Sequence, residues 1–345
     1  MYPHQAVPCV RGPDGLVRVL VTGATGFIGA ALAEGLVARG DRVRALVRAT
    51  SRTAALERLG VELARGDVCD PSTLGTAVDG CDVVVHLAGA VKAIRSREFF
   101  LANGEGTLHV AEACARAARP PRLVYVSSLA AAGPASGGRP RSEDDPPAPV
   151  SRYGESKLAG ERAVRALAGQ LEACIVRPPI VYGPRDSELM PQLLRMARLG
   201  VVVRAGPEKR YSLVHVSDLC DGIVAVVDRG RSVGRDGSGG TYFLDDGESH
   251  SWDEIALAAC SAAGRRARVV RVPELTSALL VGGATLVAAL TRKASILSFD
   301  KLREMREPAW TCTSERARRE LGYAPRFPLA EGMANAVAWF RARDG

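Results

Sequence analysis

The sequence predicts a doubly wound α/β fold, a parallel sheet with helices on both faces, joined to a smaller and interleaved C-terminal substrate lobe. Short apolar runs alternate with amphipathic stretches over the first half of the chain, as is typical of parallel strands connected by right-handed crossovers. A glycine-rich turn follows the first of these runs. The length of 345 residues and the hydrophobic content of 47% are sufficient for a large core.

The first strand is expected at Val17–Val21, because this apolar run ends in the glycine turn. Helical spacing of apolar residues then predicts a helix at Ala30–Ala38, which Gly40 ends. Five further apolar runs predict strands at 42–47, 61–64, 82–87, 123–127 and 173–177. Helical patterns fill the intervals between them, including 98–118 and 151–167.

A segment rich in Gly and Pro, 132–149, predicts an irregular connection before the helix at 151–167. From Pro178 the pattern becomes less regular, and we expect returns to the main sheet near 211–216 and 241–244. The predicted organisation is a loose leader at 1–16, a Rossmann-type domain at 17–177 and a substrate lobe at 178–345.

The formal net charge of +8 suggests an acidic partner, yet the arginines are scattered along the sequence. No basic stripe or aromatic-interleaved motif accompanies them, which argues against nucleic-acid binding. A phosphate-bearing cofactor or substrate accounts for part of the charge. The eight cysteines show no Cys-x-x-Cys pair and no histidine at zinc spacing, so we expect no metal site and mostly buried, reduced thiols in a cytoplasmic protein.

One segment, Leu275–Thr291, contains no charged residue over seventeen positions, the lower end of the range for a membrane span. A buried or substrate-covering helix is the favoured interpretation, and peripheral membrane contact is the alternative, ahead of a true span. Gly282 and Gly283 weaken the segment as an isolated helix. The stretch before Val17 has no apolar run and predicts neither a signal peptide nor an anchor.

The glycine turn predicts a dinucleotide site. Gly23, Gly26 and Gly29 follow a strand and open a helix, an arrangement that lets the backbone approach a pyrophosphate at a helix N-terminus. About 20 residues further on, an NAD site would place a carboxylate for the ribose hydroxyl. The chain has Arg48 there, followed by Ser51 and Arg52, which favours NADP over NAD through hydrogen bonds to a 2′-phosphate.

Tyr153 and Lys157 predict a general acid/base. At positions i and i+4 of a helix they lie on one face, where an ammonium can favour the phenolate. Such a shift is needed because an unperturbed phenol, with a pKa of about 10, is a poor base at neutral pH. A third group should be a hydroxyl that polarises the reacting oxygen of the substrate, and Ser127 and Ser128 are the two candidates. Only one of them is expected to reach the site, because successive strand residues face opposite sides.

Together these residues resemble the extended short-chain dehydrogenase/reductase superfamily, in its NAD-dependent epimerase/dehydratase branch, from about Val17 to Phe340. The motifs that carry the resemblance are Thr22-Gly-Ala-Thr-Gly-Phe-Ile-Gly29, Gly66-Asp67, His86-Leu-Ala-Gly89, Asn103 with Gly106-Thr107, Val126-Ser-Ser128, Tyr153 with Lys157, Arg177-Pro178, Val181-Tyr-Gly-Pro184 and His215-Val-Ser-Asp-Leu219.

The resemblance implies that Tyr153 exchanges a proton with the substrate oxygen, while Lys157 binds the nicotinamide ribose and lowers the phenol pKa. It also implies Ser128 as the polarising hydroxyl, because the family serine stands five residues before a glycine, here Gly133. Asn103 matches an asparagine near the nicotinamide. The cofactor contacts expected are Gly23, Thr25, Gly26, Phe27, Ile28, Gly29, Arg48, Ser51, Arg52, Asp67, Val68, Ala88, Gly89, Ala90, Tyr153, Lys157 and Pro178.

Two of these assignments have a structural alternative, since Asp67 could cap its own loop instead of accepting from the adenine amine, and Asn103 could serve only the fold. His86 and His215 are expected to be structural, because neither belongs to a metal-ligand set or faces a paired base. By analogy with the family, we expect a homodimer through the helices around 98–118 and 151–167.

Departures from the family pattern reduce the number of reactions that the resemblance implies. Nucleotide-sugar dehydratases carry an Asp-Glu pair directly after the triad hydroxyl, whereas this chain has Leu129 and Ala130. Nucleotide-sugar epimerases usually place an arginine four residues before the histidine of His-Val-x-Asp-Leu, where this chain has Tyr211, with Arg210 one place away.

The chain therefore looks more similar to dihydroflavonol reductases and 3β-hydroxysteroid dehydrogenases. The expected reaction is reversible hydride transfer to a small-molecule ketone of moderate polarity. An NAD-dependent nucleotide-sugar epimerase with the same triad is the first alternative, and a non-catalytic NADP-sensing protein is the second.

Overall fold

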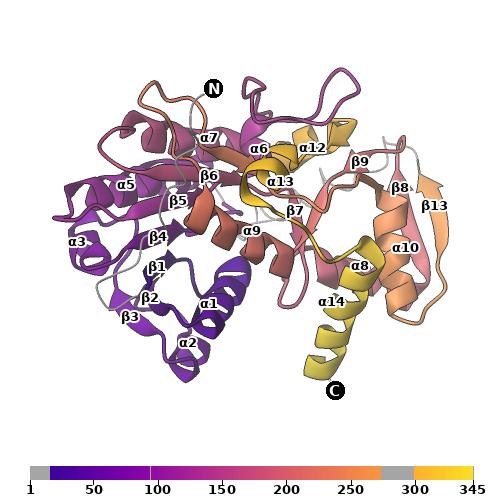
Figure 1. Cartoon of the computed structure of the whole chain (residues 1–345). Helices are drawn as coiled ribbons and strands as arrows, with labels where there is room; N and C mark the ends of the chain where they lie inside the picture. Colours follow the sequence, from indigo (N-terminus) through magenta and orange to yellow (C-terminus); the bar gives the residue numbers. More distant parts are fainter. Residues whose placement is uncertain (1–15, 94, 273–298, 345) are drawn as a thin grey trace.

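A computed structural model describes residues 16–93, 95–272 and 299–344 (Figure 1). Its main sheet has seven strands in the order β11-β6-β5-β4-β1-β2-β3, and every pairing within it is parallel. The strands are β1 (Arg18–Thr22), β2 (Arg42–Val47), β3 (Glu62–Arg65), β4 (Val83–His86), β5 (Arg122–Val126), β6 (Ala173–Arg177) and β11 (Thr241–Phe243). The predicted doubly wound fold is confirmed.

Helices cover both faces of this sheet. On one face lie α1 (Phe27–Arg39), α2 (Ala54–Arg58) and α9 (Val216–Arg229). On the other face lie α3 (Leu74–Val78), α5 (Gly106–Arg116) and α7 (Arg152–Ala166). Alternate side chains of β1 enter different cores, because Val19 and Val21 pack with the first set of helices and Leu20 packs with the second.

The helix expected at 98–118 is divided into three parts. They are α4 (Ser96–Phe99), a π-helical turn η2 (Phe100–Glu105) and α5. The register change of a π-turn, a feature frequent at functional sites, re-aims the residues before α5. Short connecting elements are η1 (Pro71–Thr73) and α6 (Leu129–Ala132).

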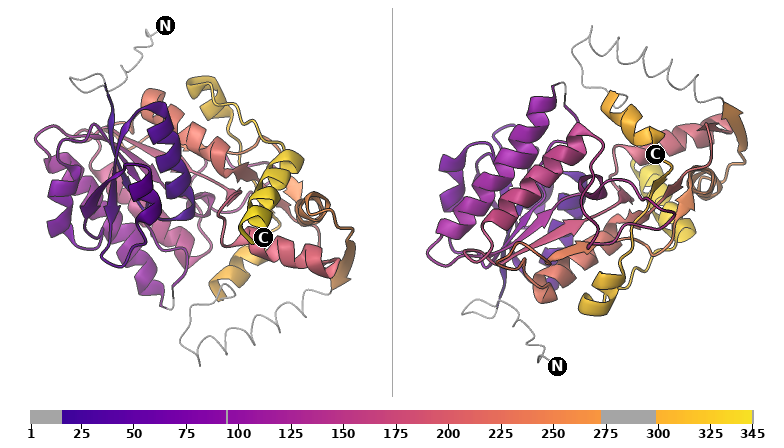
Figure 2. Two further views of the ribbon diagram at one scale, coloured as in Figure 1. Left: turned by 90° about the horizontal axis from the view of Figure 1, so that it is seen from below. Right: turned by 90° about the horizontal axis from the view of Figure 1, so that it is seen from above.

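A smaller lobe lies beside the sheet domain (Figures 1 and 2). Its helices α8 (Leu189–Leu199), α10 (Trp252–Ala262) and α14 (Leu329–Asp344) enclose a third core around Leu193, Ile255 and Met333. Its short strands are β7 (Ile180–Tyr182), β8 (Val201–Ala205), β9 (Arg210–Tyr211), β10 (Leu213–His215), β12 (His250–Ser251), β13 (Arg268–Val272) and β14 (Ala309–Trp310). Two further helices are α12 (Phe299–Arg306) and α13 (Glu315–Leu321).

Of the two predicted returns to the main sheet, one is right and one is wrong. The segment at 241–244 supplies β11, which pairs with β6 at the edge of the sheet. The segment at 211–216 stays outside, because β11 occupies that edge and β10 pairs with β7 instead.

In the described ranges no helix is long and apolar enough to cross a membrane. The apolar segment 275–291 and the leader, up to residue 15, lie outside the described residues. The seven described cysteines are all free thiols, of which Cys69 is exposed and the other six are buried.

Candidate active site

The glycine loop joins β1 to α1 at the point where the strand order reverses, between β1 and β4. Gly23 has a positive φ of 73°, and a Cβ on it would lie 2.8 Å from the Ala88 nitrogen. A Cβ on Gly29 would lie 2.2 Å from the Gly23 oxygen, so the helix packs on the loop as closely as backbone allows. Helix α1 begins at Phe27 after the N-cap Gly26, which provides no side-chain cap, and its first turn has no acidic residue. These features fit a pyrophosphate at the helix N-terminus.

The carboxyl ends of β2 and β3 form the part of the site expected to receive the adenosine. Arg48 is exposed there, its backbone N–H donates to Ser51 Oγ at 3.1 Å, and Arg65 Nη1 donates to the Arg48 carbonyl at 3.3 Å. Asp67 Oδ1 accepts from the Cys69 N–H at 2.9 Å, so one of its oxygens caps its own loop. Arg65 is a second cation that sequence reasoning missed, because only the parallel pairing of β2 and β3 brings it beside Arg48.

The other predicted cofactor contacts line the same edge. Thr25 and Gly26 are exposed, Phe27 and Ile28 are half-buried, and Val68 is buried below the β3 end. Ala88, Gly89 and Ala90 follow β4, and the buried Pro178 follows β6, where its carbonyl accepts from the Leu129 N–H at 2.9 Å. Arg52 is exposed beyond the β2 end.

Tyr153 and Lys157 lie one turn apart on α7, which Ser151 caps by accepting from the Gly154 N–H. Tyr153 is half-buried and Lys157 is buried. The Lys157 ammonium donates to the Val126 carbonyl at 2.7 Å and lies 4.8 Å from the centre of the Tyr125 ring. It is therefore held against the end of β5, one helical turn from Tyr153.

The pKa of the Tyr153 phenol is shifted upward, whereas the sequence predicts that Lys157 lowers it. Burial raises the pKa of Tyr153 to about 12, opposed by a hydrogen bond with Ser128 and reinforced by Glu304. Desolvation sets the direction of this shift, and Lys157, whose ammonium is engaged with the β5 backbone, is not among its causes. Burial also lowers the pKa of Lys157 to about 8, opposed by the charge of Glu161. At neutral pH the site thus holds a protonated phenol beside a cationic ammonium.

The two competing serines point in different directions. Ser128 ends β5 as the N-cap of α6, accepting from the Ala130 N–H at 3.1 Å, and it bonds with Tyr153. Ser127 is buried and donates to Glu161 Oε1 at 2.6 Å, on the side away from the phenol. The structure brings Ser128, and not Ser127, to Tyr153.

Glu161 and Arg177 form a buried ion pair below this site. Arg177 Nε and Nη2 donate to the two carboxylate oxygens at 2.8 and 2.6 Å. Glu161 stands one turn beyond Lys157 on α7, and Arg177 ends β6. The pair therefore ties the helix that carries the phenol to the sheet. The position of Glu161 on the same face of α7 as Tyr153 and Lys157 could have been predicted from the sequence, since the three residues are spaced i, i+4 and i+8.

Asn103 lies in the η2 turn and holds the loop after β4. Its Oδ1 accepts from the Ala90 N–H at 2.8 Å, while Nδ2 donates to the Ala90 carbonyl at 3.0 Å and to Ser156 Oγ at 2.9 Å. Ser156 in turn donates to the Tyr153 carbonyl at 2.7 Å. A Cβ on Gly89 would lie 2.5 Å from Asn103 Oδ1 and 3.8 Å from Lys157 Nζ, so this loop lies directly against α7.

His86 continues the same network toward the glycine loop. Its Nδ1 lies 2.7 Å from Thr22 Oγ1 and its Nε2 lies 3.1 Å from Thr107 Oγ1, which donates to the Asn103 carbonyl. Because that threonine has given its only proton, His86 Nε2 must be the donor and Nδ1 the acceptor. Burial, with a contribution from Lys157, lowers the pKa of His86 to about 3.

His215 caps α9 by accepting from the Ser217 N–H at 3.3 Å, and burial lowers its pKa. Among the described residues no group of three His, Cys, Asp or Glu side chains could hold a metal ion. The His215 ring packs against Tyr182 and Phe327.

The acidic pair that would indicate a dehydratase is replaced by Leu129 and Ala130, and Arg210, the arginine nearest to the position that binds a sugar-nucleotide diphosphate in epimerases, already makes other hydrogen bonds. Leu129 and Ala130 are buried in α6. Arg210 donates from Nη2 to the Ser249 carbonyl at 2.6 Å and from Nη1 to Glu254 at 3.4 Å. Tyr211 is half-buried, and burial raises its pKa.

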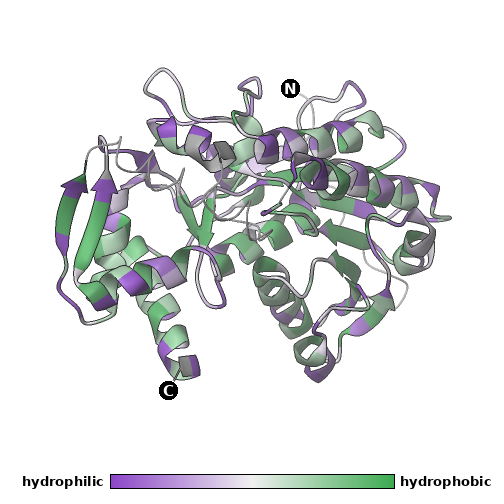
Figure 3. Ribbon diagram, turned by 180° about the vertical axis from the view of Figure 1, so that it is seen from behind, coloured by the Kyte–Doolittle hydropathy of each residue, from purple (hydrophilic) through white to green (hydrophobic). Residues whose placement is uncertain are grey.

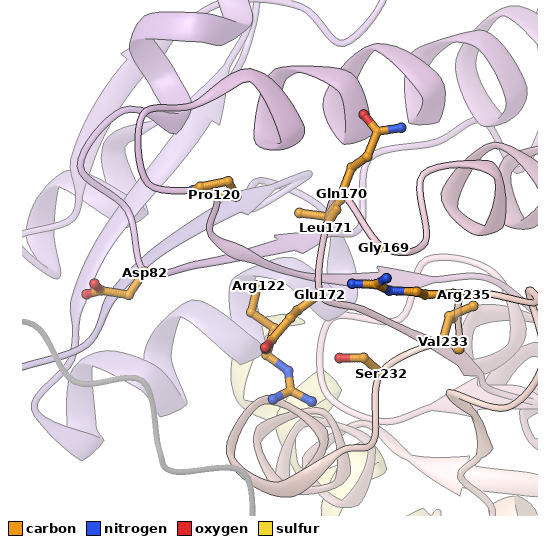
Figure 4. A pocket seen from close by; sticks show the side chains of 11 residues that line it. Asp82, Pro120, Arg122, Gly169, Gln170, Leu171, Glu172, Ser232, Val233 and Arg235 are labelled. Carbon is orange, nitrogen blue, oxygen red and sulfur yellow. The ribbon is translucent and has the colours of Figure 1, made fainter.

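A surface depression of about 530 Å³ lies at the opposite, amino edge of the sheet (Figure 4). Its lining includes Asp82, Arg122 and Glu172, each at or just before the start of a strand. Arg122 Nη2 turns inward to the Gly230 carbonyl and to Cys174 Sγ. The depression is thus remote from the carboxyl edge that carries Tyr153.

A glycine loop at the switch point of a parallel sheet, with a tyrosine and a lysine one turn apart beside it, defines an NAD(P)-dependent enzyme of the extended short-chain dehydrogenase/reductase superfamily. The chain belongs to the NAD dependent epimerase/dehydratase family, whose model matches residues 19–238.

Two curated relatives are similar over most of their length. A ceramide reductase of Caulobacter vibrioides is 34% identical, over 94% of this chain and 94% of the relative. A 4-hydroxy-2-methyl-3-oxo-4-farnesyl-3,4-dihydroquinoline-1-oxide ketoreductase of Stigmatella aurantiaca is 32% identical, over 92% of this chain and 95% of the relative.

Solved structures share the fold. The crystal structure of gox2253 is 31% identical with a TM-score of 0.78, covering 94% of this chain and 98% of that one. Thermus thermophilus UDP-glucose 4-epimerase in complex with NAD is 24% identical with a TM-score of 0.74, covering 94% and 99% of the two chains.

Proposed function

We propose that this protein reduces a ketone to a secondary alcohol with NADPH, and that Tyr153 gives the proton to the substrate oxygen. The observation that carries the proposal is the contact of a protonated Tyr153 phenol with Ser128 beside the buried Lys157 ammonium. When bound, the reduced nicotinamide would supply a hydride to the carbonyl carbon. The reverse oxidation would use the same groups.

The phenol suits the reductive direction. Tyr153, whose pKa burial raises to about 12, is protonated at neutral pH, as an ordinary phenol also is, and it can donate as negative charge develops on the carbonyl oxygen. The Ser128 hydroxyl can donate to the same oxygen, while the positive charge of Lys157 stabilises the phenolate that Tyr153 becomes. Asn103 holds the loop after β4 against α7, and so fixes the distance between the cofactor side and the phenol.

We propose NADPH as the preferred cofactor because the β2 end presents Arg48, with Arg65 beside it, and no carboxylate. Two guanidinium groups there suit a 2′-phosphate better than a ribose hydroxyl.

For the substrate we propose a ketone attached to a large apolar group. The names of the relatives support this, since they include the ceramide and farnesyl-quinoline reductases, a 2-alkyl-3-oxoalkanoate reductase of Stenotrophomonas maltophilia, 31% identical over 93% of this chain, and a 3-beta-hydroxysteroid dehydrogenase of Mycolicibacterium neoaurum, 27% identical over 94%. The engagement of Arg210 by Ser249 and Glu254 makes a diphosphate grip at that position unfavourable.

We further propose a division of the chain near residue 177, a cytoplasmic location, and a homodimer through α5 and α7.

The purified protein, incubated with NADPH and a panel of 2-alkyl-3-oxoalkanoates and 3-ketosteroids, should oxidise one NADPH per ketone consumed. Tyr153→Phe should abolish this turnover while NADPH binding, followed by fluorescence titration, is retained. Interconversion of a UDP-sugar without net change in the nicotinamide would instead support an epimerase. Tight NADPH binding without turnover of any carbonyl or sugar would favour the sensor and count against the proposal.

A further inference from the structure

The distal side of the smaller lobe concentrates arginines that are dispersed in the sequence. Two segments, 189–207 and 255–272, contain seven arginines and no aspartate or glutamate. These arginines are Arg195, Arg198, Arg204, Arg265, Arg266, Arg268 and Arg271. Only Arg204 is buried, and it pairs with Asp253 at 2.9 Å, whereas the other six are exposed.

The two segments meet because β8 and β13 pair in parallel at this end of the lobe (Figure 1). In their register Val203 lies opposite Val270, and Arg268 lies opposite Val201. Paired residues point to the same side of a sheet, and Val202 faces the lobe core, so Val203, Val270 and Arg268 share the outer side. We call this outer side, together with Leu199 and Arg266, which stand two residues before the starts of β8 and β13, the β8–β13 face.

Aliphatic side chains lie exposed among these cations. Val203 is 45% exposed, Val270 is 43% exposed and Leu199 is 68% exposed. Seen from behind, the two strands combine hydrophobic stretches with hydrophilic bands at the outer end of the molecule (Figure 3). Apolar residues grouped on a surface and surrounded by one sign of charge mark an interaction site.

We propose that the β8–β13 face binds the surface of an anionic lipid bilayer. Arginines near such a surface are attracted by about 1 kcal/mol each, and exposed aliphatic side chains can enter the boundary between headgroups and acyl chains. A bilayer satisfies both properties at once. Binding through this face does not depend on the reductase activity.

Other occupants fit the face less well. A second copy would bring an equal set of arginines against the first, with no acid in either segment to compensate them. A nucleic acid would favour aromatic stacking positions, and the face as defined has none. The sequence after β13 also favours lipid, since 275–291 carries no charge, and the chain is described again in α12, whose Glu304 accepts from Ser151 at 2.7 Å. In sequence, the apolar run thus stands between the β8–β13 face and α12, the helix that contacts the N-cap of α7.

The test is flotation of the full chain with phosphatidylcholine vesicles that contain or lack phosphatidylglycerol. The protein should float with the anionic vesicles and not with the neutral ones, and added salt should weaken this binding. Arg266→Glu/Arg268→Glu should lower the partition coefficient about 30-fold or more. Val203→Ser/Val270→Ser should also lower it.

A matched control is Arg58→Glu/Arg119→Glu, which makes the same change of charge at exposed positions of the sheet domain. It should float as the unaltered protein does, and all variants should keep the same thermal midpoint, which shows that they are folded. An equal loss in the control, or equal flotation with neutral vesicles, would overturn the proposal. So would a dimer in solution that the Val203→Ser/Val270→Ser variant dissociates, or anionic binding that survives both variants of the face.

Discussion

Replacing Glu161 with glutamine removes a charge below the candidate active site while keeping the shape of the side chain. Glu161 is fully buried, and it accepts two hydrogen bonds from Arg177, which is 3% exposed. The change would leave the guanidinium buried without a counter-charge and turn an amide donor toward it. Removal of one partner of a buried ion pair costs about 3–5 kcal/mol, a large share of the about 5–15 kcal/mol that stabilises a native protein.

The assay is urea unfolding at neutral pH of four proteins: the unaltered chain, Glu161→Gln, Arg177→Met and the double variant. We expect each single change to lower the free energy of unfolding by about 3–5 kcal/mol. The double variant, which removes both charges, should be more stable than the sum of the single effects by at least about 2 kcal/mol. The control is Glu112→Gln, which breaks the exposed pair with Arg116 on α5 and should cost less than about 1 kcal/mol.

The reasoning would be refuted by a Glu161→Gln cost no larger than that of Glu112→Gln, or by strictly additive effects in the double variant. A second readout is independent of stability. Because the charge of Glu161 raises the pKa of Lys157, its loss should move the alkaline decline of activity to lower pH.

Three further predictions concern the site. Ser128→Ala should lower kcat about 10²–10³-fold, whereas Ser127→Ala, whose hydroxyl bonds Glu161, should mainly lower stability; equal effects on kcat would contradict the assignment of Ser128. Arg48→Ala should weaken NADPH binding about tenfold or more and leave NADH binding unchanged in fluorescence titrations, and an equal loss for both would reassign Arg48 to adenine stacking. The pKa of Lys157, about 8 in the folded chain against 10.5 ordinarily, means that the unfolded chain binds more protons between these values. The contribution of Lys157 to the free energy of unfolding should therefore rise with pH across this window, by on the order of 3 kcal/mol. Buried thiols such as Cys81, Cys114 and Cys220, whose pKa values are raised, contribute with the opposite sign, so the test is the difference in unfolding free energy between the unaltered chain and Lys157→Met; a difference that does not grow with pH would contradict the lowered pKa of Lys157.

The fold could be predicted from the sequence because its signal is local. Alternating apolar runs located the six strands from 17 to 177 to within one or two residues, and Ser151 and Leu167 bound α7 as expected. The prediction for 211–216 was wrong because strand pairing depends on which edge is available, and β11 takes it. The π-turn within 98–118 leaves no mark in the period of the apolar residues.

The site likewise combines features that local sequence patterns predict with features that depend on the folded structure. The glycine spacing and the Tyr153–Lys157 spacing are local, and the structure brings these elements together at one edge of the sheet. The pKa of the phenol depends on burial, which no spacing reveals, and its direction was opposite to the expectation. The position of Arg65 beside Arg48 and the β8–β13 face could not be predicted from the sequence, because the residues involved stand on different strands and meet only through strand pairing.

The buried imidazole of His86 gives the site a property that concerns acid. Histidines usually change charge between about pH 5 and 8, but with a pKa of about 3 this ring stays neutral throughout that range. It keeps one nitrogen as donor to Thr107 and the other as acceptor from Thr22. The connection from the glycine loop through Asn103 to the Tyr153 backbone therefore persists when the surroundings become mildly acidic, and the ring acts as a fixed spacer where another histidine would act as a pH sensor.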